Sequence, residues 1–302
     1  MPTAVSTNSF QLPITFTDFK ELTKVRLAVS VVFSSIAGYF LGAEQVQASS
    51  LLFLAFGGYC MVGASNIYNQ IIERDLDVLM KRTKNRPIPA GRVSPLVALI
   101  LAIVLTIGGV ASLYALNPKT AFFAALSIFL YACVYTPLKT KTPLAVFVGA
   151  IPGAIPFMLG WVAATNEFGI EPGTLFMIQF FWQFPHFWAL GWMLDEDYKK
   201  GGFKMLPTGK KDTGTAFQII LYTIWMLVIS IMPVFGFTGN LILSIPAAIL
   251  VFVMGMVMLI FAFKLYEKRT NKAARNLMLA SVSYITLVQL VYVFDKMIVG
   301  WI

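Results

Sequence analysis

Residues 51–87 read LLFLAFGGYCMVGASNIYNQII and then ERDLDVLMKRTKNRP. The first part, Leu51 to Ile72, is an apolar run long enough to cross a hydrocarbon core of about 30 Å as a helix. The second part places three carboxylates and five basic side chains at the end of that helix. Ionisable groups at membrane depth are rare and usually functional, so this stretch predicts a membrane protein with a functional site at a helix end.

The acids and one amide in this stretch are regularly spaced. Asn69, Glu73 and Asp77 recur every four residues and form one stripe on a helix, with Asp75 about half a turn aside. Oxygen ligands in a stripe suit Mg²⁺, which takes one or two carboxylates, keeps several waters and fills its remaining positions with phosphate oxygens. The spacing therefore predicts a site for Mg²⁺ and a phosphate-bearing ligand.

A basic cluster follows the stripe, and its cations would face the remaining charge of the phosphate. Its members are Lys81, Arg82, Lys84 and Arg86. Basic residues at a cytoplasmic helix end are common and alone would report only orientation. The acids are not explained in that way, so a functional site is favoured.

The composition indicates an all-α, polytopic membrane protein. Of the 302 residues, 58% are hydrophobic and only 12% are charged, which excludes an ordinary soluble domain. Nine apolar runs predict nine transmembrane helices. They are Val25 to Ala43, Leu51 to Ile72, Leu96 to Ala115, Thr120 to Tyr135, Leu144 to Ala164, Leu175 to Leu194, Ala216 to Phe237, Leu241 to Phe263 and Leu277 to Val299.

The Lys and Arg residues divide unequally between the two sides of such a bundle. One side holds 21 of the 23, and only Lys119 and Lys296 fall on the other. This bias places the N-terminus in the cytoplasm and the C-terminus outside. Ten of the fourteen acids lie on the same side, so the net charge of +9 reflects topology and a phosphate-facing surface, and no nucleic-acid partner is expected.

The N-terminal residues match no known targeting segment. Residues 1–19 contain no Lys or Arg and no apolar core, which fits neither a secretory signal nor a transit peptide. We expect a tail over residues 1–19, a single membrane-embedded domain over 20–302, and a bacterial inner membrane as the location. Cys60 and Cys133 fall within predicted helices, and no disulfide is expected.

A second acid-rich helix end occurs half a chain later, where an apolar helix is followed by Asp195, Glu196 and Asp197 and then by lysines. Two such ends on the cytoplasmic side could face each other and hold a diphosphate from both sides. The alternative is a solvated loop whose charges neutralise one another.

His186 is the only histidine, about two turns inside the membrane from Asp195. It could ligate a haem iron or take up a proton. Alternatively, it could donate a structural hydrogen bond to a neighbouring helix. Two further residues leave a similar choice, because Lys139 and Lys141 fit helix orientation at least as well as phosphate contact.

These motifs together resemble the protohaem IX farnesyltransferases, a branch of the UbiA-type intramembrane prenyltransferases. The resemblance rests on Asn69 to Pro87, on Trp182-Gln-x-Pro185-His186, and on Asp197-Tyr198 through Met205-Leu206-Pro207, and it runs from about Lys20 to the C-terminus. It implies nine helices around a central cavity with two acidic motifs at the cytoplasmic mouth. Glu73, where relatives commonly carry Asp, and Pro143, where they more often carry Asn, depart from the pattern.

The resemblance also implies roles for individual residues. The implied metal ligands are Asn69, Glu73, Asp75, Asp77 and Asp197, of which Asn69, Glu73, Asp77 and Asp197 count as catalytic. The implied diphosphate contacts are Arg82, Lys84, Arg86, Lys199 and Lys204, and His186 is the candidate haem contact.

The function implied by the resemblance is Mg²⁺-dependent transfer of a farnesyl group from farnesyl diphosphate to a vinyl group of protohaem IX, which yields haem O. Further expected partners are membrane lipid and, as candidates, a haem A synthase or a terminal oxidase. The nearest alternative is a prenyltransferase for an aromatic or quinone-precursor acceptor. A transporter or haem-binding subunit without chemistry is less favoured, because the acids cluster at one rim instead of the membrane midplane.

Overall fold

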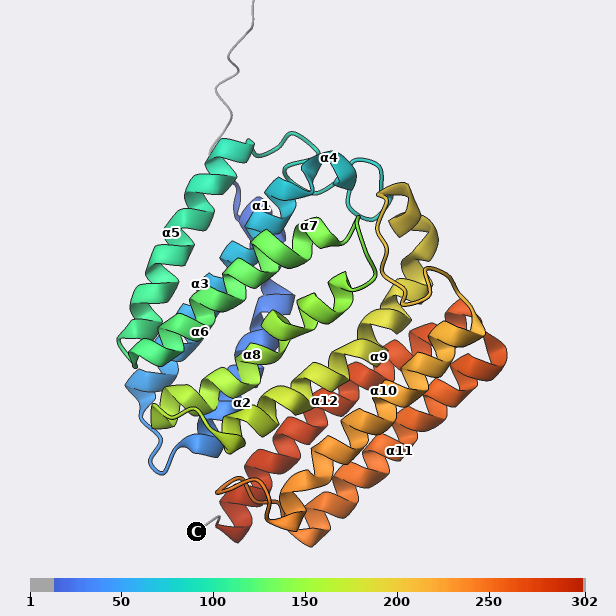
Figure 1. Cartoon of the computed structure of the whole chain (residues 1–302). Helices are drawn as coiled ribbons and strands as arrows, with labels where there is room; N and C mark the ends of the chain where they lie inside the picture. Colours follow the sequence, from blue (N-terminus) through green and yellow to red (C-terminus); the bar gives the residue numbers. More distant parts are fainter. Residues whose placement is uncertain (1–13, 301–302) are drawn as a thin grey trace, which may run out of the picture.

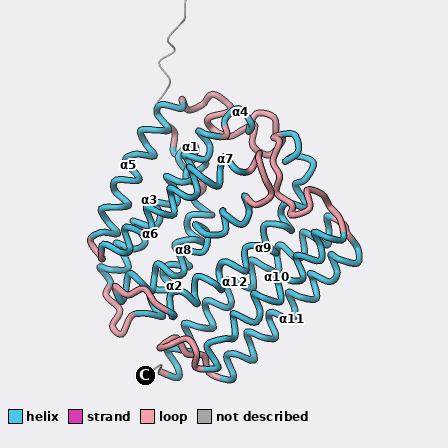
Figure 2. Tube along the Cα trace, viewed as in Figure 1, coloured by secondary structure: helices cyan, strands magenta, loops and turns pink. Residues whose placement is uncertain are grey.

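The computed structural model describes residues 14–300 of the chain, and over this range Figure 2 shows helices and loops only. The helices are α1 (Phe16–Thr23), α2 (Val25–Gly42), α3 (Ala48–Ile72), α4 (Arg74–Asp77), α5 (Pro95–Tyr114), α6 (Pro118–Phe129), α7 (Thr136–Leu138), α8 (Ala145–Thr165), α9 (Ile170–Lys200), α10 (Thr213–Ile231), α11 (Ile245–Lys268) and α12 (Asn271–Val299), with a π-helical turn η1 (Leu130–Tyr135) and a 3₁₀ turn η2 (Met232–Phe235). The division into a tail of residues 1–19 and one domain falls partly outside the described range and stays a prediction.

Eight of the described helical segments are long and apolar enough to cross a membrane. They are α2, α3, α5, the continuous segment Pro118–Leu138, α8, the segment Thr213–Phe235, α11 and α12. The expectation of an all-α, polytopic membrane protein is therefore confirmed. The remaining predicted span, Leu175 to Leu194, lies within α9, a helix of 31 residues that carries both polar and charged side chains and is not among the eight.

Several helix starts follow from short sequence signals. Ser94, Asn117, Ser244 and Thr270 each accept a hydrogen bond from a backbone N–H in the first helical turn, and a proline opens α5 and α6. A side-chain cap satisfies one otherwise unpaired donor, and proline at the first position removes another. These signals place the helix ends within a few residues of the predicted spans.

The long helices form two groups that meet along α8 and α9 (Figure 1). One group contains α2, α3, α5, α6 and α8, and the other contains α9, α10, α11 and α12. Contacts between α8 and α9 and between α2 and α12 join the two groups. The short helices α1, α4 and α7 lie at the same end of the bundle, opposite the end where the chain terminates (Figure 1).

The closest helix packing is between α2 and α8. A Cβ atom on Gly160 would collide with the backbone oxygen of Ser35, and one on Gly38 would collide with that of Phe157. Small residues allow such approach where no hydrophobic force drives helices together in lipid. Pro156 in α8 cannot donate to the carbonyl of Pro152, and Ser127 Oγ of α6 donates to it instead, at 3.3 Å.

Candidate active site

The stripe of Asn69, Glu73 and Asp77 is buried at the end of α3, where these residues are 2%, 4% and 0% exposed. Regular helix ends at Ile72, and Glu73 forms the C-cap. The Glu73 N–H still donates to Asn69 O at 2.9 Å, and the Asp77 N–H donates to Glu73 O at 2.8 Å. Backbone hydrogen bonds between residues four apart therefore continue past the end of α3. They keep the three side chains on one face, although the single helix predicted from the sequence is interrupted at Glu73.

Both buried carboxylates have cationic partners. Lys139 Nζ donates to Glu73 Oε1 at 2.8 Å, and Arg86 Nη1 donates to Asp77 Oδ2 at 2.7 Å. The second oxygen, Asp77 Oδ1, is buried and makes no hydrogen bond with any described residue. Burial raises the pKa of Asp77, and the Arg86 guanidinium opposes this shift. A further cation at Oδ1 would favour the ionised carboxylate.

Asp75 does not join this cluster, so the geometry gives no support to its expected role as a metal ligand, which stays a prediction. Its side chain is 86% exposed and lies 3.5 Å from Arg74. Two residues along α4 from the C-cap, the backbone has turned by about 200°, so Asp75 points away from the face that buries Glu73 and Asp77.

A π-helical turn brings the next site residues into place. In η1 the N–H of Thr136 donates to Tyr131 O, five residues back instead of four. Asn69 Nδ2 then donates to Thr136 Oγ1 at 3.3 Å. One turn later, Lys139 is buried over the ring of Tyr135, with Nζ 4.5 Å from its centroid. π-helical turns are frequent at functional sites.

Lys139 is therefore a site residue that the sequence left undecided. Thr136 and Lys139 are three residues apart, so they lie on the same face of a helix. This spacing is the sequence signal that could have indicated that both residues face the acid stripe. The π turn that aims this face inward has no comparable sequence signal.

The second acid-rich end meets the first. Asp197 lies in the last turn of α9, which continues to Lys200 instead of ending in a solvated loop. Its two carboxylate oxygens accept hydrogen bonds from the backbone N–H groups of Lys81, at 2.8 Å, and Arg82, at 3.1 Å. Arg82 Nη2 also donates to Tyr198 Oη at 3.5 Å. The segments that the sequence placed on facing ends are thus in direct contact.

Three of the expected phosphate cations lie outside the buried cluster. Lys199 is exposed and pairs with Asp195 at 2.8 Å. Lys204 Nζ donates to the backbone oxygen of Lys141 at 3.2 Å, and its backbone N–H donates to that of Lys139 at 2.7 Å, so it closes the loop after α7. Lys84 is exposed as well. Of the predicted set, Arg86 contacts the buried Asp77, and Arg82 contacts Tyr198 beside Asp197.

The helix α1 is fixed over the same end by Arg92. Its Nε donates to Asp18 Oδ1 at 2.7 Å, and its Nη1 donates to Asn85 O at 2.9 Å. Lys24 follows α1, and the sequence pattern indicates for it only a part in orienting the chain in the membrane. Burial, together with the positive charges of Arg86 and Lys139, lowers the pKa of Lys24 to about 7.

His186 is partly buried between α9 and α12. Its ring stacks on Trp182 with centroids 4.8 Å apart, and Nδ1 lies 2.8 Å from Ser281 Oγ. The Ser281 hydroxyl donates its single proton to Met278 O at 2.7 Å. His186 Nδ1 is therefore the donor in the first contact, and Nε2 carries the lone pair.

A void of about 40 Å³ lies deeper in the bundle among α2, α3, α5, α6 and α8. Its lining includes Met61 and Ser65, which precede Asn69 by two turns and one turn on α3. The void is largely apolar, so a mainly apolar space lies on the membrane side of the acid stripe.

The donor set fits Mg²⁺ better than a metal bound by protein alone. Over residues 14–300, no three His, Cys, Asp or Glu side chains gather in a metal-binding arrangement. Mg²⁺ requires only one or two carboxylates when substrate phosphates complete its shell. The unpartnered Asp77 Oδ1 is an oxygen ligand of this kind.

The profile of the UbiA prenyltransferase family matches residues 31–285. The chain belongs to the UbiA prenyltransferase family. Two protoheme IX farnesyltransferases are each 66% identical to it: that of Christiangramia forsetii, over 94% of this chain and 95% of the relative, and that of Flavobacterium psychrophilum, over 93% and 95%. The resemblance expected from the motifs is confirmed.

Solved structures of the UbiA family share the fold. A digeranylgeranylglyceryl phosphate synthase superposes with a TM-score of 0.76 at 17% identity, covering 92% of this chain and 97% of that one. A UbiA homologue from Archaeoglobus fulgidus bound to GPP and Mg²⁺ superposes with a TM-score of 0.66 at 14% identity, covering 91% and 99%.

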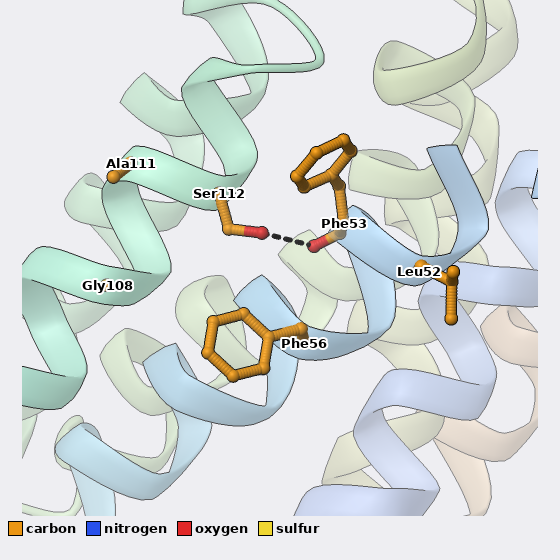
Figure 3. A pocket seen from close by; sticks show the side chains of 6 residues that line it. All are labelled: Leu52, Phe53, Phe56, Gly108, Ala111 and Ser112. Atoms are coloured by element: carbon orange, nitrogen blue, oxygen red, sulfur yellow. Dashed lines mark hydrogen bonds between the residues drawn. The ribbon is translucent and has the colours of Figure 1, made fainter. Parts of the chain in front are cut away.

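A groove on the side of this UbiA bundle is separate from the acid-rich end. It lies between α3 and α5, is lined by Leu52, Phe53, Phe56, Gly108, Ala111 and Ser112, and contains a hydrogen bond from Ser112 Oγ to Phe53 O of 2.9 Å (Figure 3). Leu52 and Glu73 are 21 residues apart in sequence, which places the groove about 30 Å along the helix from the site.

Proposed function

We propose that this chain transfers a farnesyl group from farnesyl diphosphate to a vinyl group of protohaem IX and so makes haem O. The observation that carries this assignment is 66% identity, over nearly the whole chain, to protoheme IX farnesyltransferases. The site supports this assignment, because buried carboxylates and cations from two neighbouring helix ends are suited to bind a diphosphate together with Mg²⁺.

The proposed reaction first forms an allylic cation and a diphosphate anion, and the cation then reacts with the vinyl group. The C–O bond of farnesyl diphosphate breaks, and its electron pair leaves with the diphosphate. The π electrons of the protohaem vinyl group attack the allylic cation, and water adds to the resulting carbocation with loss of a proton. Preorganised cations at the leaving oxygen favour the first step, and an apolar surround protects the allylic cation.

Asn69, Glu73 and Asp77 are the proposed Mg²⁺ ligands, with the free Asp77 Oδ1 as the clearest binding atom. Asp197 is proposed to hold a second Mg²⁺ through Oδ2, which accepts one backbone hydrogen bond and keeps a second acceptor position. Its Oδ1 accepts the other backbone hydrogen bond and lies 3.9 Å from Lys200 Nζ. Mg²⁺ bound here would neutralise the diphosphate as it departs. The homologue from A. fulgidus that binds GPP together with Mg²⁺ supports this choice.

Arg82, Arg86 and Lys139 are the proposed protein cations for the diphosphate. Arg86 and Lys139 bridge to the carboxylates, and Arg82 reaches Tyr198 across the two helix ends. The farnesyl chain would extend from the stripe toward the void beside Ser65 and Met61. This void is far smaller than a farnesyl group, so entry of the chain requires side chains such as the flexible Met61 to move.

His186 is the proposed haem contact. Its Nδ1 lies against Ser281, so Nε2 is the ring nitrogen proposed to ligate haem iron, a role that a neutral imidazole nitrogen fills. His186→Ala should weaken protohaem binding and leave pyrophosphate affinity intact, both measured by titration of the purified protein. Unchanged protohaem affinity would remove the role.

We further infer nine spans with the N-terminus in the cytoplasm, in a bacterial inner membrane. Helix α9 packs against α8, α10 and α12, so neighbouring helices meet its polar groups, as in the bond from Gln183 Nε2 to Ala150 O of 2.8 Å. Alkaline phosphatase fused after residue 302 should be active, whereas a fusion in the loop after Lys200 should be inactive. The reverse pattern of phosphatase activity would mean that the N-terminus lies outside the cytoplasm.

The activity is tested by incubating membranes that contain the protein with protohaem, farnesyl diphosphate and Mg²⁺. Chromatography should reveal a more hydrophobic haem, and its mass should equal protohaem plus farnesyl and hydroxyl groups. Turnover only with an aromatic acceptor would assign the chain to that class of prenyltransferase. Absence of turnover with any acceptor would indicate a binding or transport protein instead.

A further inference from the structure

Lys24 occupies a backbone conformation that lysine rarely adopts. It separates α1 from α2 with φ 49° and ψ 59°, in the left-handed region. A side chain with a Cβ costs about 1–2 kcal/mol there. Such strained residues persist where the surrounding structure holds them, often at ligand sites.

Two amides of α3 hold this junction in place. Asn66 Nδ2 donates to the backbone oxygen of Thr23 at 3.3 Å, and Gln70 Nε2 donates to that of Leu22 at 2.9 Å. Asn66 and Gln70 are one turn apart on α3, and Asn69 and Glu73 of the acid stripe follow the same spacing. The chain around Lys24 is therefore tied to the helix that carries the stripe.

The side chain of Lys24 is only partly exposed, and it makes no hydrogen bond or ion pair with a described residue. The charges that act on it are those of Arg86, Lys139, Glu73 and Arg82. Arg86 and Lys139 already pair with the buried carboxylates Asp77 and Glu73. Lys24 is thus left without a carboxylate partner among the described residues. Since a partly buried cation without a partner is unfavourable, the unpaired ammonium of Lys24 favours an anionic ligand.

From this arrangement we propose that Lys24 is a further diphosphate-binding residue, directed at the ligand by the left-handed junction between α1 and α2. This inference rests on the proposed function, in that the anion is the diphosphate of the prenyl donor. Lysine suits such a role because its ammonium is a compact point charge with three donors.

The test uses full-length protein in detergent and inorganic pyrophosphate with Mg²⁺ as the titrated ligand. Lys24→Gly removes the cation but favours the left-handed backbone, so the variant should fold at least as well as the parent protein. Its pyrophosphate affinity should fall about 10- to 100-fold, the loss expected for a charge-assisted contact. Lys24→Arg should restore most of the affinity.

A matched control is Lys20→Ala, which removes an exposed lysine one turn earlier on α1 and should leave the affinity within about twofold. Lys24→Asn, which also tolerates the left-handed region, repeats the test if the glycine variant melts early. Unchanged affinity in Lys24→Gly or Lys24→Asn, or an equal loss in Lys20→Ala, would overturn the proposal. Failure of the parent protein to make haem O in the membrane assay would instead count against the proposed function, and the titration would still decide whether Lys24 binds the anion.

Discussion

The Lys139 ammonium lies 2.8 Å from the Glu73 carboxylate, and both side chains are less than a tenth exposed. Lys139 is the C-cap of the short helix α7, and Glu73 is the C-cap of α3, so this pair joins two segments at the end of the bundle. A buried ion pair is costly to form and still costlier to break from one side. Such a pair is well suited to exchange partners when Mg²⁺ and diphosphate enter.

Lys139→Ala should reduce both stability and substrate binding. Removing one partner of a buried ion pair leaves an unpaired charge and costs about 3–5 kcal/mol. Melting in detergent and pyrophosphate titration would measure the two effects. Lys141→Ala is the control, because Lys141 is exposed and its loss should change stability by less than about 0.5 kcal/mol.

The double variant Glu73→Gln with Lys139→Met should recover much of the lost stability, since it removes both charges. It should remain inactive in the haem assay. Stability as low as that of Lys139→Ala alone would argue that the pair contributes through packing and not through charge.

Asp77→Asn should raise the Mg²⁺ concentration needed for half-maximal activity by about tenfold or more, since Asp77 Oδ1 is the free carboxylate oxygen of the stripe. Chelation of divalent cations should abolish activity in the parent protein, and added Mg²⁺ should restore it. An unchanged Mg²⁺ requirement in Asp77→Asn would exclude this carboxylate as a ligand. Asp75→Asn is the matched control and should retain the parent requirement, because its side chain is exposed.

Asp197→Asn should disturb the contact between the two acid-rich ends. Hydrogen bonds from Lys81 and Arg82 N–H groups to a charged acceptor are worth about 1.5–3 kcal/mol, and an amide oxygen replaces only one of them. Haem O formation should fall at least tenfold, and protease cleavage near residue 82 should become faster. Glu196→Gln, one residue earlier and exposed, should match the parent in both measurements.

The positions of the long helices could be predicted because each apolar run has to match the membrane thickness. α2 begins at the predicted Val25, and α3 ends at the predicted Ile72. The stripe was predictable as well, because its spacing of four survives the break at Glu73. α9 is different, since its polar residues weaken the hydropathy signal while neighbouring helices satisfy them in the folded chain.

The sequence does not predict which way the side chains of individual lysines point. Lys139 is buried by a π-helical turn, and Lys24 lies at a left-handed junction where Gly or Asn is more usual. Both features depend on tertiary contacts and leave no local pattern. By contrast, Lys199 pairs with Asp195 on its own helix, a local contact that competes with the expected phosphate role.

Gly160→Ala should destabilise the protein by at least about 2 kcal/mol, because its Cβ would meet backbone atoms of Ser35 and Tyr39 that cannot move without separating α2 from α8. Gly173→Ala is the control, since no atom lies within 4 Å of the position its Cβ would take and alanine favours helix. Thermal melting should separate the two variants clearly. Equal melting temperatures would mean that the two helices are not held in this close register.

The docking of α1 should depend on pH through Asp18. Hydrogen bonds from Thr15 and from Arg92 hold the pKa of Asp18 below its usual value. The ionised form is therefore favoured by folding, so its stabilising contribution is complete above the unfolded pKa of about 3.9 and is lost as the pH falls through the lower folded value. The parent protein should melt above Asp18→Asn by a constant margin between about pH 5 and 8, and the margin should shrink below about pH 4. In an Arg92→Gln background the Asp18→Asn change should have a smaller effect, because much of the interaction is already absent. A margin that varied between pH 6 and 8 would place the titrating group elsewhere, since a carboxyl with a lowered pKa is fully ionised throughout that range.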